Sequence, residues 1–211
     1  MPAKAGIRQK MEIIAFILLF AGIHIVLLFL KREREFHESY QNTNSQKQAP
    51  PPKQKAQSEV QIEELPKARV KWIFDGDTVA VTQGWHELTI RLDSIDCPED
   101  GQPWGDIAKY ALMKLISRKI VRLEVHGRDH YGRTLATIYI WGDKKNEWLN
   151  VNERMVMLGH AWVLRAFYDH LPKNRQDKLN SLERWSKSKK VGLWNTPDPT
   201  PPWEWRKQLT S

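Results

Sequence analysis

A short segment of the sequence, RLDSIDCPE beginning at Arg91, gathers charged side chains around one proline. The carboxylates of Asp96 and Glu99 flank the pair Cys97 and Pro98. Pro98 fixes its own φ and restricts the backbone of Cys97, so the Cys97 carbonyl and the two carboxylates are held on a stiff corner of the chain. A stiff group of oxygen atoms is suited to hold a metal ion.

Two more charged residues belong to turn-like segments elsewhere in the chain. Asp75 and Gly76 of FDGDTV are ordinary hairpin-turn residues, but Asp77 stands where the next strand would begin, and a turn requires no second carboxylate there. Arg133 follows the loop glycine of DHYGR. An arginine in that place is usually solvated or paired with a surface carboxylate. Arg133 therefore indicates a functional site only in combination with the other charged residues.

Taken together, these residues contain the parts that phosphodiester hydrolysis needs. Asp77, Asp96 and the main-chain carbonyl of Cys97 form a hard, oxygen-only ligand set appropriate for Ca²⁺. Arg91 and Arg133 can hold phosphate oxygens with their planar, permanently charged guanidinium groups. The remaining carboxylate would orient or deprotonate a water that attacks phosphorus, while the cations neutralise the charge that develops on its oxygens.

The elements that must position these residues follow from the hydrophobic pattern. Alternating apolar and polar residues predict five strands: 68–74, 77–83, 86–95, 119–125 and 133–141. Helical spacing predicts a helix after the third strand and two more near the end: 103–117, 149–159 and 174–189. The pattern therefore predicts a mainly β protein with helices (α+β), built as a small five-stranded barrel of the OB type.

The N-terminal part has a different composition. Residues 13–30 are apolar except for His24, and a helix rising about 1.5 Å per residue over this length crosses a hydrocarbon core. We favour a retained transmembrane anchor over a cleaved signal peptide, because KRERE follows the run where a cleavage site would need small residues. A tail of residues 1–12 precedes the anchor. A disordered linker rich in Gln, Pro, Lys and Ser is predicted at 31–67, and a Pro/Trp-rich tail at 196–211.

The motifs DGDTV, RLDSIDCPE and DHYGR, in this order and with a predicted helix between the second and third, resemble the staphylococcal nuclease (thermonuclease) family. The resemblance covers roughly residues 68–195, and the GLW near the end also fits bacterial members. It implies a five-stranded OB barrel with three helices. It also implies an endonuclease that uses Ca²⁺ and cleaves DNA and RNA with little sequence preference.

The resemblance also implies a role for each residue of the set. Asp77, Asp96 and the Cys97 carbonyl match the family's calcium ligands, although threonine stands at the place of Cys97 in the staphylococcal enzyme. Glu99 matches the catalytic glutamate.

On the substrate side, Arg91 and Arg133 match the two phosphate-binding arginines, and Tyr131 matches a tyrosine that helps to bind the nucleotide phosphate. The segment GHAWVLRAFYDH lacks a clear match to the family's base-stacking tyrosines. Three residues are left as substitutes: Arg165, Phe167 and Tyr168.

A second function class stays open, namely a catalytically silent OB module that binds nucleic acid or protein at the membrane. The net charge of +8 allows a polyanionic partner but also serves solubility, so charge does not choose between the classes. The intact set of acidic and basic residues favours the nuclease. We expect a monomer without a protein partner, tethered to the lipid bilayer through residues 13–30.

The side of the membrane cannot be read from charge, because three basic residues precede the span and three follow it. A nonspecific nuclease would endanger the genome from the cytosol, and weak calcium sites fill at extracellular concentrations. We therefore expect the nuclease domain on the extracytoplasmic side.

Overall fold

The computed structural model describes Lys31, residues 60–142 and residues 146–209. The chain divides into two compact units, Met1–Ser58 and Glu59–Ser211, and the second contains every element below. The predicted anchor at 13–30 and most of the predicted linker lie outside the described residues, so both stay predictions. Among the described residues, no helix has the length and apolar character needed to span a membrane.

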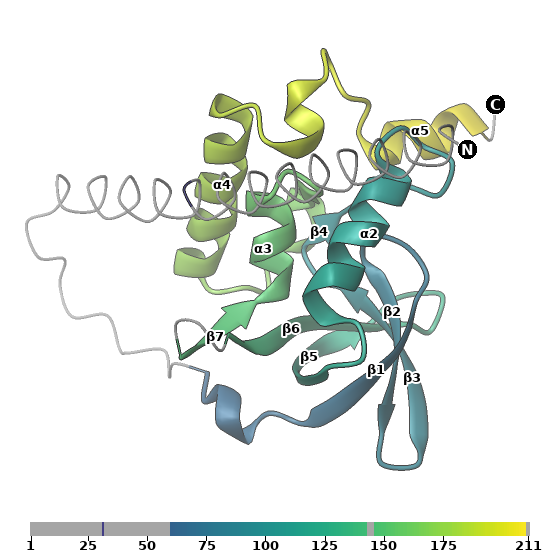
Figure 1. The fold of residues 1–211 in the computed structure, drawn as a ribbon, viewed down its shortest axis with the longest axis vertical. Helices are drawn as coiled ribbons and strands as arrows, with labels where there is room; N and C mark the ends of the chain where they lie inside the picture. The colour runs from purple at the N-terminus through teal and green to yellow at the C-terminus, as the bar shows by residue number, and fades with distance from the viewer. Residues whose placement is uncertain (1–30, 32–59, 143–145, 210–211) are drawn as a thin grey trace, which may run out of the picture. The chain divides into compact units, whose positions relative to one another are not determined.

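The second unit is built around a closed barrel (Figure 1). Its strands are β1 (Lys67–Ile73), β2 (Thr78–Gln83), β3 (His86–Leu92), β5 (Ile120–Arg128) and β6 (Thr134–Gly142). They pair antiparallel in the order β3-β2-β1-β5-β6, and a parallel pairing between β3 and β6 closes the ring. The five-stranded barrel predicted from the alternating pattern is therefore confirmed.

Helix α2 (Gly105–Ile116) packs on the barrel through one apolar stripe. Ala108, Leu112 and Ile116 recur every fourth residue and are completely buried, as expected for the inner face of an amphipathic helix. The helical spacing also places Ile107 next to this stripe, but 47% of its surface is exposed. The buried stripe is thus narrower than the sequence pattern predicts.

The remaining helices form a second layer (Figure 1). A short strand, β7 (Glu147–Asn150), pairs with β6 and leads into α3 (Val151–Met157), which packs against α4 (Lys173–Ser188). The two-residue strands β4 (Ile95–Asp96) and β8 (Trp162–Val163) pair with each other beside the barrel. Two short 3₁₀ helices, η2 (Arg165–Phe167) and η3 (Gly192–Asn195), flank α4 in sequence, while a third, η1 (Ile62–Glu64), precedes β1 and contacts β5.

Both ends of the folded unit differ from the sequence prediction. The last residues assigned to the linker pack on the barrel, because the carbonyl of Leu65 accepts a hydrogen bond from Arg122 and that of Pro66 accepts one from the Leu123 amide. The predicted tail contains a further helix, α5 (Pro202–Leu209), beyond the three that were expected. Its Pro202 at the first helical position supplies the fixed φ that favours a helix start.

Asn152 ties α3 to the strand ends that carry the charged segment. Its buried side chain accepts a hydrogen bond from the Ile138 amide at 3.1 Å and donates to the carbonyls of Asp93 and Ala136 at 3.0 and 3.2 Å. Asn152→Ala should lower the free energy of unfolding by about 2–3 kcal/mol, since it leaves buried backbone groups unsatisfied. Urea denaturation beside the exposed variant Asn195→Ala measures this, and equal stability of the two variants would contradict it.

Candidate active site

The turn between β1 and β2 places the first carboxylate of the site. Asp75 accepts hydrogen bonds from the amides of Asp77 and Thr78 at 2.9 and 2.7 Å, which closes the turn as its sequence predicts. Asp77 is buried, and its Oδ2 accepts a hydrogen bond from the Cys97 amide at 2.7 Å. The turn and the stiff corner at Cys97 are therefore joined through one carboxylate.

Arg91 spans the two predicted metal-ligand carboxylates. Its Nε lies 3.1 Å from Asp77 Oδ1, and its Nη2 lies 2.6 Å from Asp96 Oδ1. Nη1 donates to the carbonyls of Leu92 and Ile95 at 2.6 and 2.8 Å, which orients the guanidinium. Because all three charged side chains are buried, this group is an ion-pair network with little access to water.

The buried Asp77 carboxyl has a raised pKa. Burial, the largest cause, raises the pKa of the Asp77 carboxyl to about 7 against the lowering effect of Arg91. The nearby carboxylates of Asp75 and Asp96 raise the pKa of Asp77 further, and the Cys97 amide opposes them. A bound cation would stabilise the charged form of the buried Asp77 carboxylate, and its neighbours in the set offer oxygen donors, so the donor set fits a metal ion.

Glu99 is positioned by a residue that was not predicted, Gln102. The Gln102 side-chain carbonyl accepts a hydrogen bond from the Glu99 amide at 2.9 Å, and its amide group donates to the Thr200 carbonyl at 2.7 Å. A Cβ at Gly105 would lie only 2.1 Å from the Glu99 carbonyl oxygen, so the first residue of α2 must be glycine for this loop to pack closely. The corner that carries Glu99 is thus braced from two sides.

A third arginine, Arg206 of α5, reaches the same carboxylates. Its Nη2 lies 2.9 Å from Asp96 Oδ2, and its Nη1 forms an ion pair with Glu99 Oε1. Figure 1 shows α5 close to the end of α2 where the loop from β4 enters that helix. No local pattern predicts this contact, because Arg206 lies in a segment predicted to be a tail.

The DHYGR loop lies beside the network. Asp129 accepts hydrogen bonds from the amides of Tyr131 and Arg133, and its Oδ2 pairs with the Arg133 Nε at 2.7 Å. Arg133 Nη1 lies 3.5 Å from Thr78 Oγ1, which in turn donates to Asp77 Oδ1. Tyr131 is largely exposed and lies under the Arg133 guanidinium, with 5.4 Å between the guanidinium carbon and the ring centroid.

The Cys97 side chain is buried and bonded to the main chain, so its thiol is not available as a metal ligand. Its Sγ donates to the Gly76 carbonyl at 3.2 Å, and a Cβ at Gly76 would lie 2.7 Å from Cys97 Cβ. Gly76 is therefore needed for this close approach. Burial raises the pKa of the Cys97 thiol well above its usual value, so the thiol stays protonated. A metal would meet only the main-chain carbonyl of this residue.

Two of the three substitutes considered for base stacking are bonded to side chains of α4. Arg165 is held by Glu183, with Nη2 2.6 Å from its Oε2. The Tyr168 hydroxyl accepts a hydrogen bond from Asn180 at 3.2 Å, while Phe167 is exposed. Of the two aromatic residues, only Phe167 has a largely exposed ring.

The structure thus gathers Asp77, Arg91, Asp96, Cys97 and Glu99 at one end of the barrel, and it links Arg133 to them through Thr78. These contacts show that the residues lie close together. The catalytic and binding roles of the residues stay predictions. The arrangement can bind a cation beside a phosphate and can place a carboxylate next to both.

Comparison with known proteins agrees with this arrangement. A family described as "Staphylococcal nuclease homologue" matches residues 89–196, a range that begins after Asp77. An "Uncharacterized endonuclease" of Escherichia coli is 36% identical over 138 residues, which are 65% of this chain and 83% of that protein. A "Micrococcal nuclease" of Shigella flexneri is 33% identical over 138 residues, or 64% of this chain and 77% of that protein. A "Probable staphylococcal-like nuclease CAN4" of rice is 31% identical over 178 residues, 84% of this chain and 32% of that protein.

Proposed function

Because this chain belongs to the staphylococcal nuclease family and is a nuclease, we propose that it hydrolyses the phosphodiester bonds of DNA and RNA with the help of Ca²⁺. One observation carries the proposal. A buried guanidinium, that of Arg91, spans the carboxylates of Asp77 and Asp96, and Glu99 stands on the adjoining corner. This is a site that can neutralise a phosphate and supply a proton acceptor beside it.

The ion would be held by Asp77, Asp96 and the Cys97 carbonyl. All three donors are oxygen atoms, so the set suits a hard divalent cation better than a soft one. When bound, the ion would polarise a phosphate oxygen and lower the pKa of a nearby water.

The side chains have separate roles in the proposed reaction. Glu99 accepts the proton of the attacking water as general base. Arg91 and Arg133 bind phosphate oxygens and stabilise the charge that develops on them in the transition state. Tyr131 is exposed beside Arg133, and its hydroxyl donates a hydrogen bond to a substrate phosphate.

The test is cleavage of single-stranded DNA, duplex DNA and RNA by purified residues 59–211, with Ca²⁺ and with EDTA. We expect cleavage of all three substrates with Ca²⁺ and none with EDTA. Cleavage that continues in EDTA would refute the metal requirement. If the folded protein binds nucleic acid but cleaves none with any divalent ion, the chain is a silent OB module instead.

Arg206 should compete with the metal for Asp96. Its guanidinium is bonded to Asp96 and Glu99, so a cation at Asp96 must displace it or share the carboxylate. Arg206→Ala should lower the Ca²⁺ concentration for half-maximal cleavage by about two- to tenfold, the range for a half-exposed ion pair.

A calcium titration of the cleavage rate measures this effect, with Arg184→Ala on the exposed face of α4 as the control. An unchanged calcium requirement would mean that Arg206 does not compete with Ca²⁺ for Asp96. A loss of cleavage at saturating calcium would instead make Arg206 part of the catalytic machinery.

We also propose that the nuclease unit is tethered to the membrane by residues 13–30 and lies on its extracytoplasmic side. The support is the apolar run itself, the tethering length of 31–67, and the danger of a nonspecific nuclease in the cytosol. Protease added to intact cells or spheroplasts should digest the unit. Full protection, under conditions that degrade an external control protein, would reverse the assignment.

A further inference from the structure

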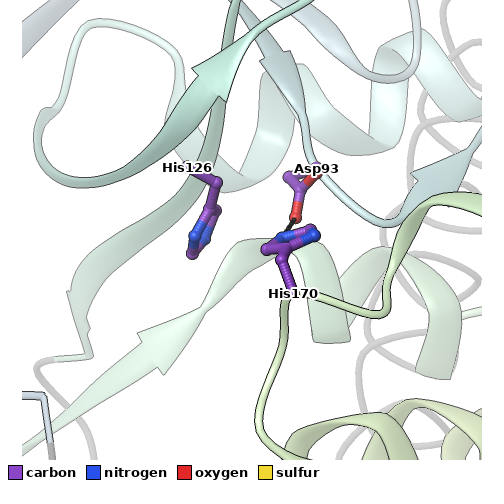
Figure 2. Close-up of side chains that lie close together, drawn as sticks. All are labelled: Asp93, His126 and His170. Carbon is purple, nitrogen blue, oxygen red and sulfur yellow. Dashed lines mark hydrogen bonds and ion pairs between the residues drawn. The ribbon is translucent and has the colours of Figure 1, made fainter.

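A second group of ligand-type side chains lies apart from the residues proposed for catalysis. Asp93 follows β3, His126 belongs to β5, and His170 lies between η2 and α4. One potential ligand atom from each lies within 4.8 Å of the other two. Figure 2 shows the three side chains converging from three different parts of the chain.

The contacts within the group are close and polar. His170 Nε2 lies 2.8 Å from Asp93 Oδ2, which also accepts a hydrogen bond from the Ser94 hydroxyl at 2.7 Å. The ring centroids of His126 and His170 are 4.9 Å apart, with an angle of 51° between the ring planes. Thr137 Oγ1 lies 3.0 Å from His126 Nε2 and helps to fix that ring. Outer contacts of this kind hold ligands in place at metal sites.

The burial of the group changes from one side to the other. Asp93 is buried and His126 is partly buried, while the His170 side chain is 39% exposed. An ion could therefore enter from the His170 side and be held at depth by the Asp93 carboxylate. A cavity lined in part by Asp93, Ser94 and Thr137 adjoins the group.

The electrostatic surroundings favour neutral imidazole at His126. Burial, the largest cause, lowers the pKa of His126, and Arg175 lowers it further against the raising effects of Asp93 and Glu124. Glu124 is itself bound by Arg175, at 2.7 and 2.8 Å from one guanidinium nitrogen, so it serves as an outer charge and not as a fourth ligand. Neutral imidazole is the form that binds metals.

We propose that Asp93, His126 and His170 bind one Zn²⁺ ion, with water at the remaining position. Two imidazole nitrogens and one carboxylate form a ligand set that suits Zn²⁺, whereas the all-oxygen set at Asp77 and Asp96 suits Ca²⁺. The ion would fasten the segment before α4 to the barrel. An ion pair between His170 and Asp93, with His126 merely packed beside it, is the rival explanation of the same contacts.

The test uses the full chain without a polyhistidine tag, stripped of metals with a chelator that is then removed. Zn²⁺ is titrated by calorimetry in saturating Ca²⁺, which occupies the oxygen site, and Co²⁺ is followed by its visible absorption. We expect one Zn²⁺ per chain and the intense absorption of low-coordinate Co²⁺. The melting temperature should rise by about 5 °C or more once free Zn²⁺ exceeds about a hundred times its dissociation constant.

Two variants decide whether these residues are the ligands. His170→Ala removes an exposed ligand, and His126→Gln replaces a ring that is mostly buried. Each should weaken Zn²⁺ binding at least tenfold and reduce the thermal shift at the same Zn²⁺ concentration to about half or less. His86→Ala, an exposed histidine at the start of β3, should bind Zn²⁺ as the parent does. Absence of stoichiometric binding, or binding that both ligand variants retain, would overturn the proposal. The outcome is independent of whether the chain cleaves nucleic acid.

Discussion

Replacing Glu99 by glutamine is expected to lower kcat for DNA cleavage by about 10²- to 10⁴-fold, the contribution of a general base. Glutamine keeps the shape of the side chain but cannot accept a proton at neutral pH. The side chain is about one-third exposed, with 35% of its surface accessible, so the fold should be retained. KM for DNA should change little, because the arginines proposed to bind phosphate are untouched.

The control is Glu87→Gln, which alters an exposed carboxylate paired with Lys71 far along β3. Steady-state rates at saturating Ca²⁺ separate two roles of Glu99. If the variant recovers near-parent turnover at high Ca²⁺, Glu99 organises the metal's water shell and is not the base. A general base also implies that the acidic limb of the pH–rate profile disappears in the variant.

The barrel could be predicted because the sequence patterns that form its strands are local. Alternating residues and turn signals such as Asp75 and Gly76 specify each strand without reference to the rest of the chain. The meeting of Asp77 with the corner at Cys97 was less local, since it depends on the register that pairs Thr78 with Arg91. Before the structure, the family resemblance assigned Asp77 and the Cys97 carbonyl to one site.

The parts that escaped prediction depend on contacts between distant segments. Gln102 reaches Thr200, and Arg206 reaches Glu99, so neither contact leaves a pattern within its own neighbourhood. The cluster of Asp93, His126 and His170 has no motif spacing, because three separate elements contribute one residue each. Such sites are defined by tertiary packing, which hydrophobic periodicity does not encode.

The two arginines proposed to bind phosphate should differ in their effects on stability. Arg91→Ala removes the cation between two buried carboxylates and the donor to the Leu92 and Ile95 carbonyls. It should lower the free energy of unfolding by about 3–5 kcal/mol without Ca²⁺, because it leaves uncompensated buried charge. Cleavage by the folded fraction should fall at least 10²-fold, the cost of losing one transition-state donor.

Arg133→Ala should reduce cleavage by a similar factor but leave stability nearly unchanged. Its side chain is 31% exposed, and Asp129 still accepts the amides of Tyr131 and residue 133 that shape the loop. Urea denaturation and cleavage rates, measured beside the exposed strand variant Arg69→Ala, give both quantities for each protein. If Arg133→Ala kept full activity, phosphate binding would rest on Arg91 alone. If Arg91→Ala were as stable as Arg69→Ala in EDTA, the stability of the carboxylate network would not depend on Arg91. Arg91 would then act only in binding the substrate.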